Sequence, residues 1–220
     1  QERGGPARAP QVEARPVKKT TGNFLADPGF EEGGAGWKWL EWSREWAPFR
    51  VVDGFGASGA RSAALEVRGG PGDGRTRVWG VVQEIAPEVF PPVVSGKYRV
   101  GRWEPGAARK VYVQAVVISM HAQGMLPSTQ VRYVLDGVTE QPYDMSNARY
   151  RFVHRRSAPP IGEWIDFSLP VRADFLELWG RLPPPGTPLR VLFEARYDDR
   201  PADASVAADV YYDDLFVGVP

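Results

Sequence analysis

Four of the eight tryptophans lie in one short segment, residues 37–49, with the sequence WKWLEWSREWAPF. Exposed aromatic rings can stack on sugar rings or on apolar groups of a partner protein. The alternative is a second hydrophobic layer, because large aromatic side chains are mostly buried. We expect at least one of Trp39, Trp42 and Trp46 to contact a ligand or a partner.

A second candidate set lies in the polar stretch 139–148, TEQPYDMSNA, and just after it. Tyr143, Asp144, Asn147 and Arg149 combine an aromatic ring, an amide and charges. Such groups bind sugar hydroxyls, although any polar loop contains them too. Of these residues, we count Tyr143 as a contact residue.

Two further regions offer groups that could bind a ligand. Trp179 lies in a long connection, residues 172–188, and we expect it to contact a ligand or partner as well. Near residue 150 the basic residues could form an anion or partner patch, or the solvated face of a strand. They are Arg149, Arg151, Arg155 and Arg156. His121 and His154 have no acidic residue at a recognisable spacing, which favours structural roles for both.

The sequence lacks the common catalytic motifs: there is no G-x-S-x-G, H-E-x-x-H, Walker A or Rossmann glycine pattern. The many carboxylates leave a paired-carboxylate glycosidase open, with Glu163 and Asp166 as candidates. Their strand contains Trp164, however, and already has a structural explanation. We therefore expect no catalysis.

The composition excludes several other classes of protein. Lys plus Arg and Asp plus Glu each number 27, so the net charge is zero, which argues against a nucleic-acid binder. The absence of cysteine excludes disulfides, Cys-ligated zinc and iron–sulfur clusters. No apolar run is long enough for a transmembrane segment. Because the chain starts at Gln1 without a signal-peptide core, we expect a processed protein that is secreted or periplasmic; a shortened chain is the alternative.

The first 21 residues differ from the rest of the chain. Val12 and Val17 are their only large apolar residues, and five basic residues stand against two acidic ones. A free segment of this kind is disordered. We expect residues 1–21 to form a flexible or partner-bound arm, and 22–220 to form a single domain with an insertion near 120–160.

From residue 49 onward, short runs rich in Val, Ile, Tyr, Phe and Trp alternate with Gly- and Pro-rich turns, as in all-β folds. Ten strands are predicted, at 49–55, 62–69, 78–85, 97–104, 110–119, 130–138, 149–156, 163–171, 189–197 and 208–219. The best candidate for a helix is the short segment 173–180. This pattern predicts a β-sandwich or a barrel.

Six motifs, in order, resemble those of galactose-binding-like jelly rolls, a superfamily that includes carbohydrate-binding modules of the family 4, 9 and 22 type. They are NFLADPGFEEGGAGW (23–37), SGARSAALEVRG (58–69), VVQEI (81–85), SGKYRVGRW (95–103), IGEWIDFSLPV (161–171) and ADVYYDDLFVG (208–218). The resemblance implies a jelly-roll β-sandwich over roughly 22–219, with Trp37 in its core.

The resemblance also implies one structural Ca²⁺, held by the glutamate after the opening Gly-Phe and by an aspartate of the last strand. In this sequence these residues are Glu31 and Asp213, with Glu32, Asp27 and Asp214 as neighbouring alternatives. Calcium binds carboxylate and carbonyl oxygens, which a tight glycine-rich turn can supply. The alternative is that these carboxylates cap turns or face water.

Two functions remain open, and both are forms of binding. The first is an accessory or scaffold subunit that docks on a larger extracytoplasmic assembly, such as a membrane-bound respiratory or photosynthetic complex. The arm, the insertion and the tryptophan segment would then form its interface. The second, which the resemblance implies, is a secreted carbohydrate-binding module that recognises a glycan through exposed Trp and Tyr. We favour the first.

Overall fold

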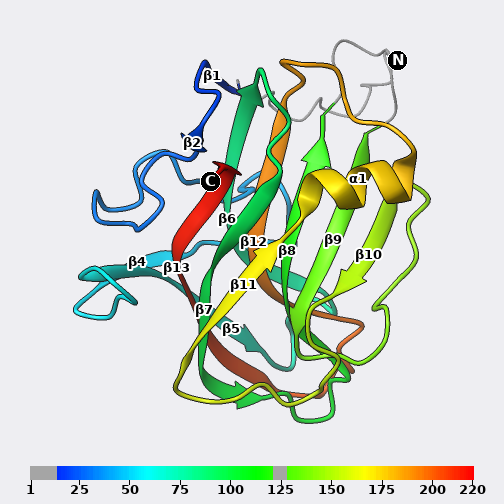
Figure 1. Ribbon diagram of the computed structural model, residues 1–220. Helices are drawn as coiled ribbons and strands as arrows, with labels where there is room; N and C mark the ends of the chain where they lie inside the picture. Colours follow the sequence, from blue (N-terminus) through cyan, green and yellow to red (C-terminus); the bar gives the residue numbers. More distant parts are fainter. Residues whose placement is uncertain (1–13, 121–127) are drawn as a thin grey trace, which may run out of the picture.

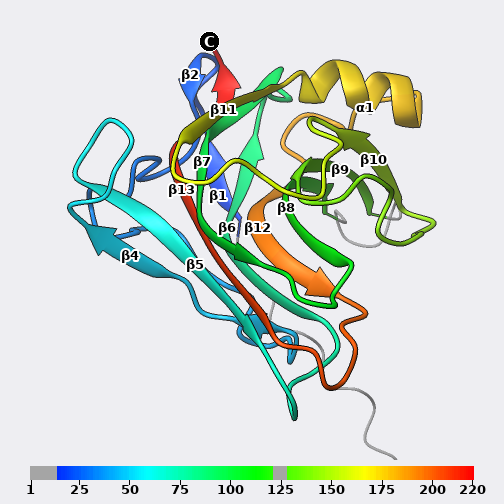
Figure 2. The same cartoon turned by 90° about the horizontal axis from the view of Figure 1, so that it is seen from below.

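In the computed structural model, which describes residues 14–120 and 128–220, two β-sheets pack face to face as a sandwich (Figures 1 and 2). This arrangement confirms the predicted all-β jelly-roll class. No helix in the described residues is both long and apolar enough to cross a bilayer.

The seven-stranded sheet has the order β1-β6-β12-β8-β9-β10, and β3 also pairs with β6. Its strands are β1 (Arg15–Val17), β3 (Trp46–Ala47), β6 (Arg77–Pro87), β8 (Lys110–Ser119), β9 (Thr129–Asp136), β10 (Ala148–Phe152) and β12 (Leu189–Asp198).

The six-stranded sheet has the order β11-β7-β13-β5-β4, and β2 also pairs with β13. Its strands are β2 (Gly22–Asn23), β4 (Arg50–Asp53), β5 (Arg61–Gly69), β7 (Val93–Glu104), β11 (Trp164–Leu169) and β13 (Val206–Val219). The ten longer strands of the two sheets, β4 to β13, correspond to the ten predicted from the sequence.

The core lies between the sheets and is rich in aromatic rings. Phe193 of the seven-stranded sheet lies 5.7 Å from Tyr212 and 6.1 Å from Phe167, both of the six-stranded sheet, measured between ring centroids. Trp37 is buried beside Phe193, as expected. Since successive side chains of a strand point to opposite faces, the neighbours of these core residues point outward.

The single helix of the described residues, α1 (Val171–Trp179), follows β11 and agrees with the helix expected at 173–180. It ends at Gly180, whose φ of 74° places it in the left-handed region that terminates many helices. Phe175 anchors α1 in the core, 5.0 Å from the ring of Phe90.

Part of the segment expected as an arm belongs to the domain. Arg15–Val17 form β1, which pairs in parallel with the end of β6, and Val17 is buried in the core. The boundary at residue 21 therefore does not hold for these three residues, because one apolar side chain and an open strand edge suffice to dock them. Residues 1–13 of the expected arm lie outside the described residues, and so does His121.

The insertion expected near 120–160 supplies β9 and β10. β9 pairs antiparallel with β8, whereas β10 pairs parallel with β9, so the two form a pair of strands and not a hairpin. A parallel pair needs a connection that returns along the length of the strand. Residues 137–147 make this return, and they bring Tyr143 over side chains on the outer face of the sheet.

Candidate functional site

The outer face of the seven-stranded sheet carries an open hollow of about 480 Å³, which we call the central groove. Trp46 lines it on the side of β6, and Tyr143 lines it on the side of β9. Between them lie side chains of β12, β8 and β9, among them Glu194 and Arg196. The groove thus combines aromatic walls with a polar floor.

Trp46 is held at the sheet edge by backbone pairing. In β3 it lies beside Val78 of β6, and its ring lies over Gly80. A Cβ on Gly80 would come within 2.9 Å of the Trp46 ring, so glycine makes room for the ring. Nearby, Leu40 packs on an apolar patch that includes Leu192 of β12.

Tyr143 is held by two arginines. Its hydroxyl accepts a hydrogen bond of 2.5 Å from Nη1 of Arg132. Its ring centroid lies 5.4 Å from the guanidinium carbon of Arg132 and 5.6 Å from that of Arg196. Distances of this size are those of cation–π contacts, so the return connection is fastened to the floor of the groove.

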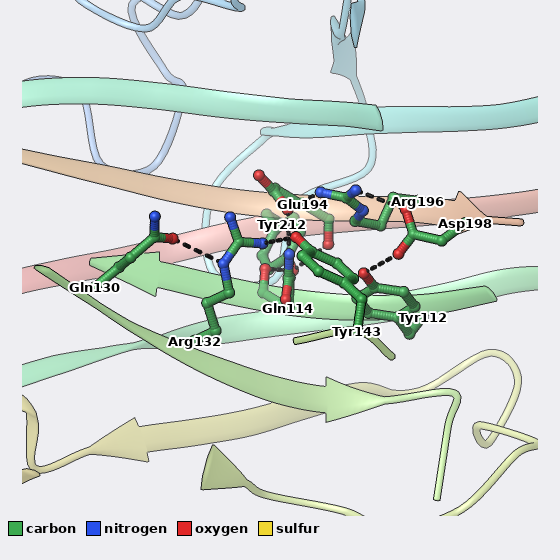
Figure 3. A network of polar contacts seen from close by, with 9 residues as sticks. All are labelled: Tyr112, Gln114, Gln130, Arg132, Tyr143, Glu194, Arg196, Asp198 and Tyr212. Carbon is green, nitrogen blue, oxygen red and sulfur yellow. Dashed lines mark hydrogen bonds and ion pairs between the residues drawn. The ribbon is translucent and has the colours of Figure 1, made fainter. Parts of the chain in front are cut away.

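The floor is a network of buried polar groups (Figure 3). Arg196 contacts Asp198 at 2.6 Å and Glu194 at 3.6 Å. Gln114 donates to Glu194 at 2.5 Å, and the Tyr112 hydroxyl donates to Asp198. Burial raises the pKa of the Tyr112 hydroxyl well above its usual value, so this group stays a neutral donor.

Two atoms of this network are buried without a hydrogen-bond partner in the described part of the chain. They are the amide oxygen of Gln114 and Nε of Arg196. Most buried polar atoms in proteins have a partner, and exceptions often mark sites with a role. The network beneath the groove therefore contains two buried polar atoms without a hydrogen-bond partner.

A second hollow, of about 590 Å³, lies further along β6; we call it the Trp39–Trp42 hollow. Trp42, with 46% of its surface exposed, is one of its lining residues. Leu40 lines both hollows, so the two are neighbours. The segment from Lys38 to Trp46 pairs with β6 at both of its ends, Lys38 with Val82 and Trp46 with Val78. These two positions on β6 are four residues, or about 13 Å, apart.

The structure divides the expected contact residues among three places. Trp46 and Tyr143 line the central groove, and Trp39 and Trp42 line the neighbouring hollow. Trp179 lines neither hollow: its Nε1 donates to the carbonyl of Gln130, and the Arg149 guanidinium covers its ring.

The polar residues at and beneath the floor of the groove were not among the expected contact residues. They are Tyr112, Gln114, Gln130, Arg132, Glu194, Arg196 and Asp198. Their signal is alternation: in β12, four charged residues and Leu192 occupy one face, while Val191, Phe193 and Ala195 occupy the other. A strand with several charges on one face and a buried opposite face indicates a polar layer on its outer side.

The basic residues near residue 150 do not form an open anion patch. Arg151 pairs with Asp174 and Glu177, and Arg156 pairs with the buried Asp136. Arg155 covers the ring of Phe152. These partners occupy the guanidinium groups and correct the patch interpretation.

The other polar candidates also lie away from the groove floor. Asp144 accepts a hydrogen bond from Gln141, and Asn147 donates one to Ser128. Asp166 lies in the six-stranded sheet and pairs with Lys97, so the candidate pair Glu163 and Asp166 is remote from the groove.

The carboxylates expected to bind calcium gather at one end of the six-stranded sheet. Asp213 is fully buried, and its two oxygens accept hydrogen bonds of 2.7 Å from the backbone N–H groups of Ala57 and Asp214. Burial raises the pKa of Asp213, and the nearby charges of Asp214 and Glu31 raise it further. Oε1 of Glu31 accepts a hydrogen bond from the Arg61 backbone.

The charge of these donors suits a cation. The carboxylates of Glu31 and Asp213 repel each other, and Asp213 accepts hydrogen bonds only from backbone N–H groups among the described residues. Within the described ranges, however, no three His, Cys, Asp or Glu side chains converge as metal ligands. A Ca²⁺ here would need backbone carbonyls as well. Asp27 is engaged elsewhere: three backbone N–H groups of its own loop bond to its carboxylate.

No protein-family model matches the sequence, and none of the curated proteins is significantly similar to it. Solved structures with a similar arrangement of strands include carbohydrate-binding modules of the β-sandwich type. One is TmCBM61 in complex with β-1,4-galactotriose, at 10% identity and a TM-score of 0.46, covering 90% of this chain and 99% of that one.

Another is the family 11 carbohydrate-binding module from Clostridium thermocellum in complex with a β-1,3-1,4-mixed-linked tetrasaccharide. It has 10% identity and a TM-score of 0.47, with coverage of 92% and 98%. A third is the xyloglucanase domain of NopAA, a type three effector from Sinorhizobium fredii, in complex with cellobiose, at 9% identity, a TM-score of 0.48 and coverage of 93% and 100%.

Proposed function

We propose that this chain binds a glycan in the central groove. The observation that carries the proposal is the pairing of two aromatic walls, Trp46 and Tyr143, with a floor of hydrogen-bonding groups. A sugar ring presents apolar C–H faces and a rim of hydroxyls, which such a site matches. This is the second of the two functions that the sequence left open, and the groove favours it over docking to a large complex.

The groove is held rigid by its own contacts, which reduces the entropy lost on binding. Tyr143 is fixed by Arg132 and Arg196, and the Trp46 ring is seated on Gly80. The Trp39–Trp42 hollow extends the aromatic surface along β6. A linear glycan of several sugar residues would therefore be long enough to contact both hollows.

We expect binding without bond cleavage. Two carboxylates of β12 at the groove, Glu194 and Asp198, contact Arg196, and Asp199 contacts Lys110. A carboxylate engaged by a cation is not free to contact a glycosidic oxygen as the general acid of a glycosidase must. Reducing-sugar release from the bound polysaccharide should accordingly stay at background.

The test is affinity gel electrophoresis of the whole chain in a panel of soluble polysaccharides. Trp46→Ala and Tyr143→Ala should each weaken retardation by the bound polymer at least tenfold. The matched control is Trp164→Ala, which removes a ring from the outer face of the six-stranded sheet, where it packs on Phe55. Equal retardation of the groove variants, the control and the wild type would refute the groove as the binding site.

We further propose a structural Ca²⁺ held by Glu31 and Asp213. What supports it is the carboxylate of Asp213, which is buried and is repelled by the charges of Asp214 and Glu31. A cation between the two would remove this repulsion and fix the turn that starts the domain.

A further inference from the structure

Arg132 of β9 is a cation of the groove without a carboxylate partner among the described residues. The other two arginines there are paired, Arg190 with Glu84 and Arg196 with Glu194 and Asp198. Arg132 lines the groove with only 8% of its surface exposed. It is thus a nearly buried positive charge whose partners are all neutral.

Those neutral partners use a minority of its donors. Nε donates to Oε1 of Gln130 at 2.8 Å, and Nη1 donates to the Tyr143 hydroxyl at 2.5 Å. A guanidinium has five N–H groups, so three have no partner in the described part of the chain. Nη2 is not among the fully buried atoms that lack a partner, and Arg132 lines the central groove.

A charge held out of water is costly unless an opposite charge accompanies it. From this we propose that the glycan carries a carboxylate, as in a uronic acid residue, and that this carboxylate binds Arg132. The planar fork of a guanidinium matches the two oxygens of a carboxylate. The inference rests on the proposed function and assigns a specificity to the same groove.

The other charges around the groove leave this position open. Glu194 and Asp198 share Arg196, but both lie on β12 and already accept hydrogen bonds from Gln114 and Tyr112. Neither is within ion-pair distance of Arg132. Asp199 is paired with Lys110 at 2.6 Å. Glu45 directly precedes Trp46 and lines the groove at that wall, across from Arg132. An anionic group is therefore drawn to β9 and not to β12.

The experiment compares acidic polysaccharides with their carboxyl-reduced counterparts, in which each carboxylate has become a primary alcohol. The probes are polygalacturonate, glucuronoxylan, alginate and hyaluronan, and affinities are measured with the whole chain at low and high salt. We expect at least one acidic polymer to bind tenfold or more tightly than its reduced form. Arg132→Gln should bring the ratio of the two affinities to about one, and this ratio is the readout because the loss of the contact with Tyr143 lowers both affinities alike.

Arg172→Gln is the matched control, because it removes the same charge from an exposed position on α1. Arg132→Lys keeps the positive charge but lacks the planar guanidinium that can bind both carboxylate oxygens. Its affinity for the acidic polymer should lie between those of the wild type and Arg132→Gln. Melting curves confirm that each variant is folded.

Three outcomes overturn the inference. If acidic and reduced polymers bind equally, and Trp46→Ala weakens both, the central groove binds glycans but Arg132 does not select a carboxylate. If neither form of any polymer binds, both proposals fail. If dextran sulfate binds as tightly as the best carboxylate polymer, the site recognises charge alone.

Discussion

Two ion pairs of the molecule each join directly opposite residues of antiparallel strands but have different surroundings. Arg190 lies directly opposite Glu84 on antiparallel strands of the seven-stranded sheet, and Lys97 lies directly opposite Asp166 in the six-stranded sheet. The side chains of the first pair are 14% and 6% exposed, and those of the second are 35% and 79% exposed. Each pair lies on the outer face of its sheet.

One cause is the strand order, since β11 is an edge strand, and the other lies outside the strands. The segment from Lys38 to Trp46 runs beside β6, and the return connection with Tyr143 crosses from β9 to β10. Glu84 lines the Trp39–Trp42 hollow, and Arg190 lines the central groove. Covering segments thus shield the charges on the outer face of the seven-stranded sheet, whereas Lys97 and Asp166 on the other sheet stay solvated.

The largest expected effect comes from breaking the buried pair. Arg190→Met leaves Glu84 buried without a cation, and we expect a loss of about 3–5 kcal/mol in the free energy of unfolding. Lys97→Met, the matched control, should cost less than about 1 kcal/mol because water solvates Asp166. Urea denaturation measures both. Similar losses in the two variants would show that the covering segments do not change the pair.

The six-stranded sheet has one exception to its solvated charges, the buried Asp213. Its pKa is raised in the folded protein, so its contribution to stability is fully present below the pKa of the unfolded chain and is lost as the pH rises through the folded pKa. At neutral pH the ionised group therefore costs stability, which a cation would restore.

Calcium should accordingly raise the melting temperature at pH 7. At a concentration 100 times its dissociation constant it would add about 2.7 kcal/mol. Glu31→Gln keeps the oxygen that accepts from Arg61 but removes the charge, so the variant should fold normally and lose the calcium effect. The control is Glu32→Gln, at an exposed neighbour. An equal calcium effect in all three proteins, or none in the wild type, would contradict the site.

A smaller effect of opposite sign is expected at Arg132. Replacing this unpaired cation by methionine removes a buried charge without leaving a buried carboxylate behind. Because such replacements are often neutral or stabilising, we expect Arg132→Met to gain about 1 kcal/mol in the free energy of unfolding. Thermal and urea unfolding would reveal it. A loss above about 2 kcal/mol would mean that the bonds to Gln130 and Tyr143 outweigh the cost of the buried charge.

Most of the fold could be predicted from the sequence because its long strands carry their own signal. In β8 and β12, Val, Ile and Phe recur with the period of a pleated sheet, and Gly- and Pro-rich turns separate them from their neighbours. The short strands β1 and β3 carry no such signal. Two or three residues show no period, and only pairing with β6 makes them strands.

The walls of the site were easier to predict than its floor. Trp46 and Tyr143 were recognised by residue type, but their meeting in one groove depends on the β3–β6 pairing and on the parallel return to β10. Neither is visible locally in the sequence. Arg132 and Arg196 had a readable signal in strand alternation, yet a charged strand face is usually solvated. Only the covering segments distinguish this face from the other.

The smallest expected effect isolates solvent screening. A double-mutant cycle of Lys97→Met and Asp166→Asn should give a coupling of about 0.2–1 kcal/mol at low salt, which 1 M NaCl should remove, because the Debye length falls to about 3 Å. The same cycle with Arg190→Met and Glu84→Gln should keep most of its coupling in 1 M NaCl, since ions do not reach a pair whose side chains are 14% and 6% exposed. Unfolding free energies of the seven proteins at two salt concentrations supply both couplings. If salt screened the Arg190–Glu84 coupling as fully as the other, the groove floor would be open to ions, and the rigidity proposed for glycan binding would lose its basis.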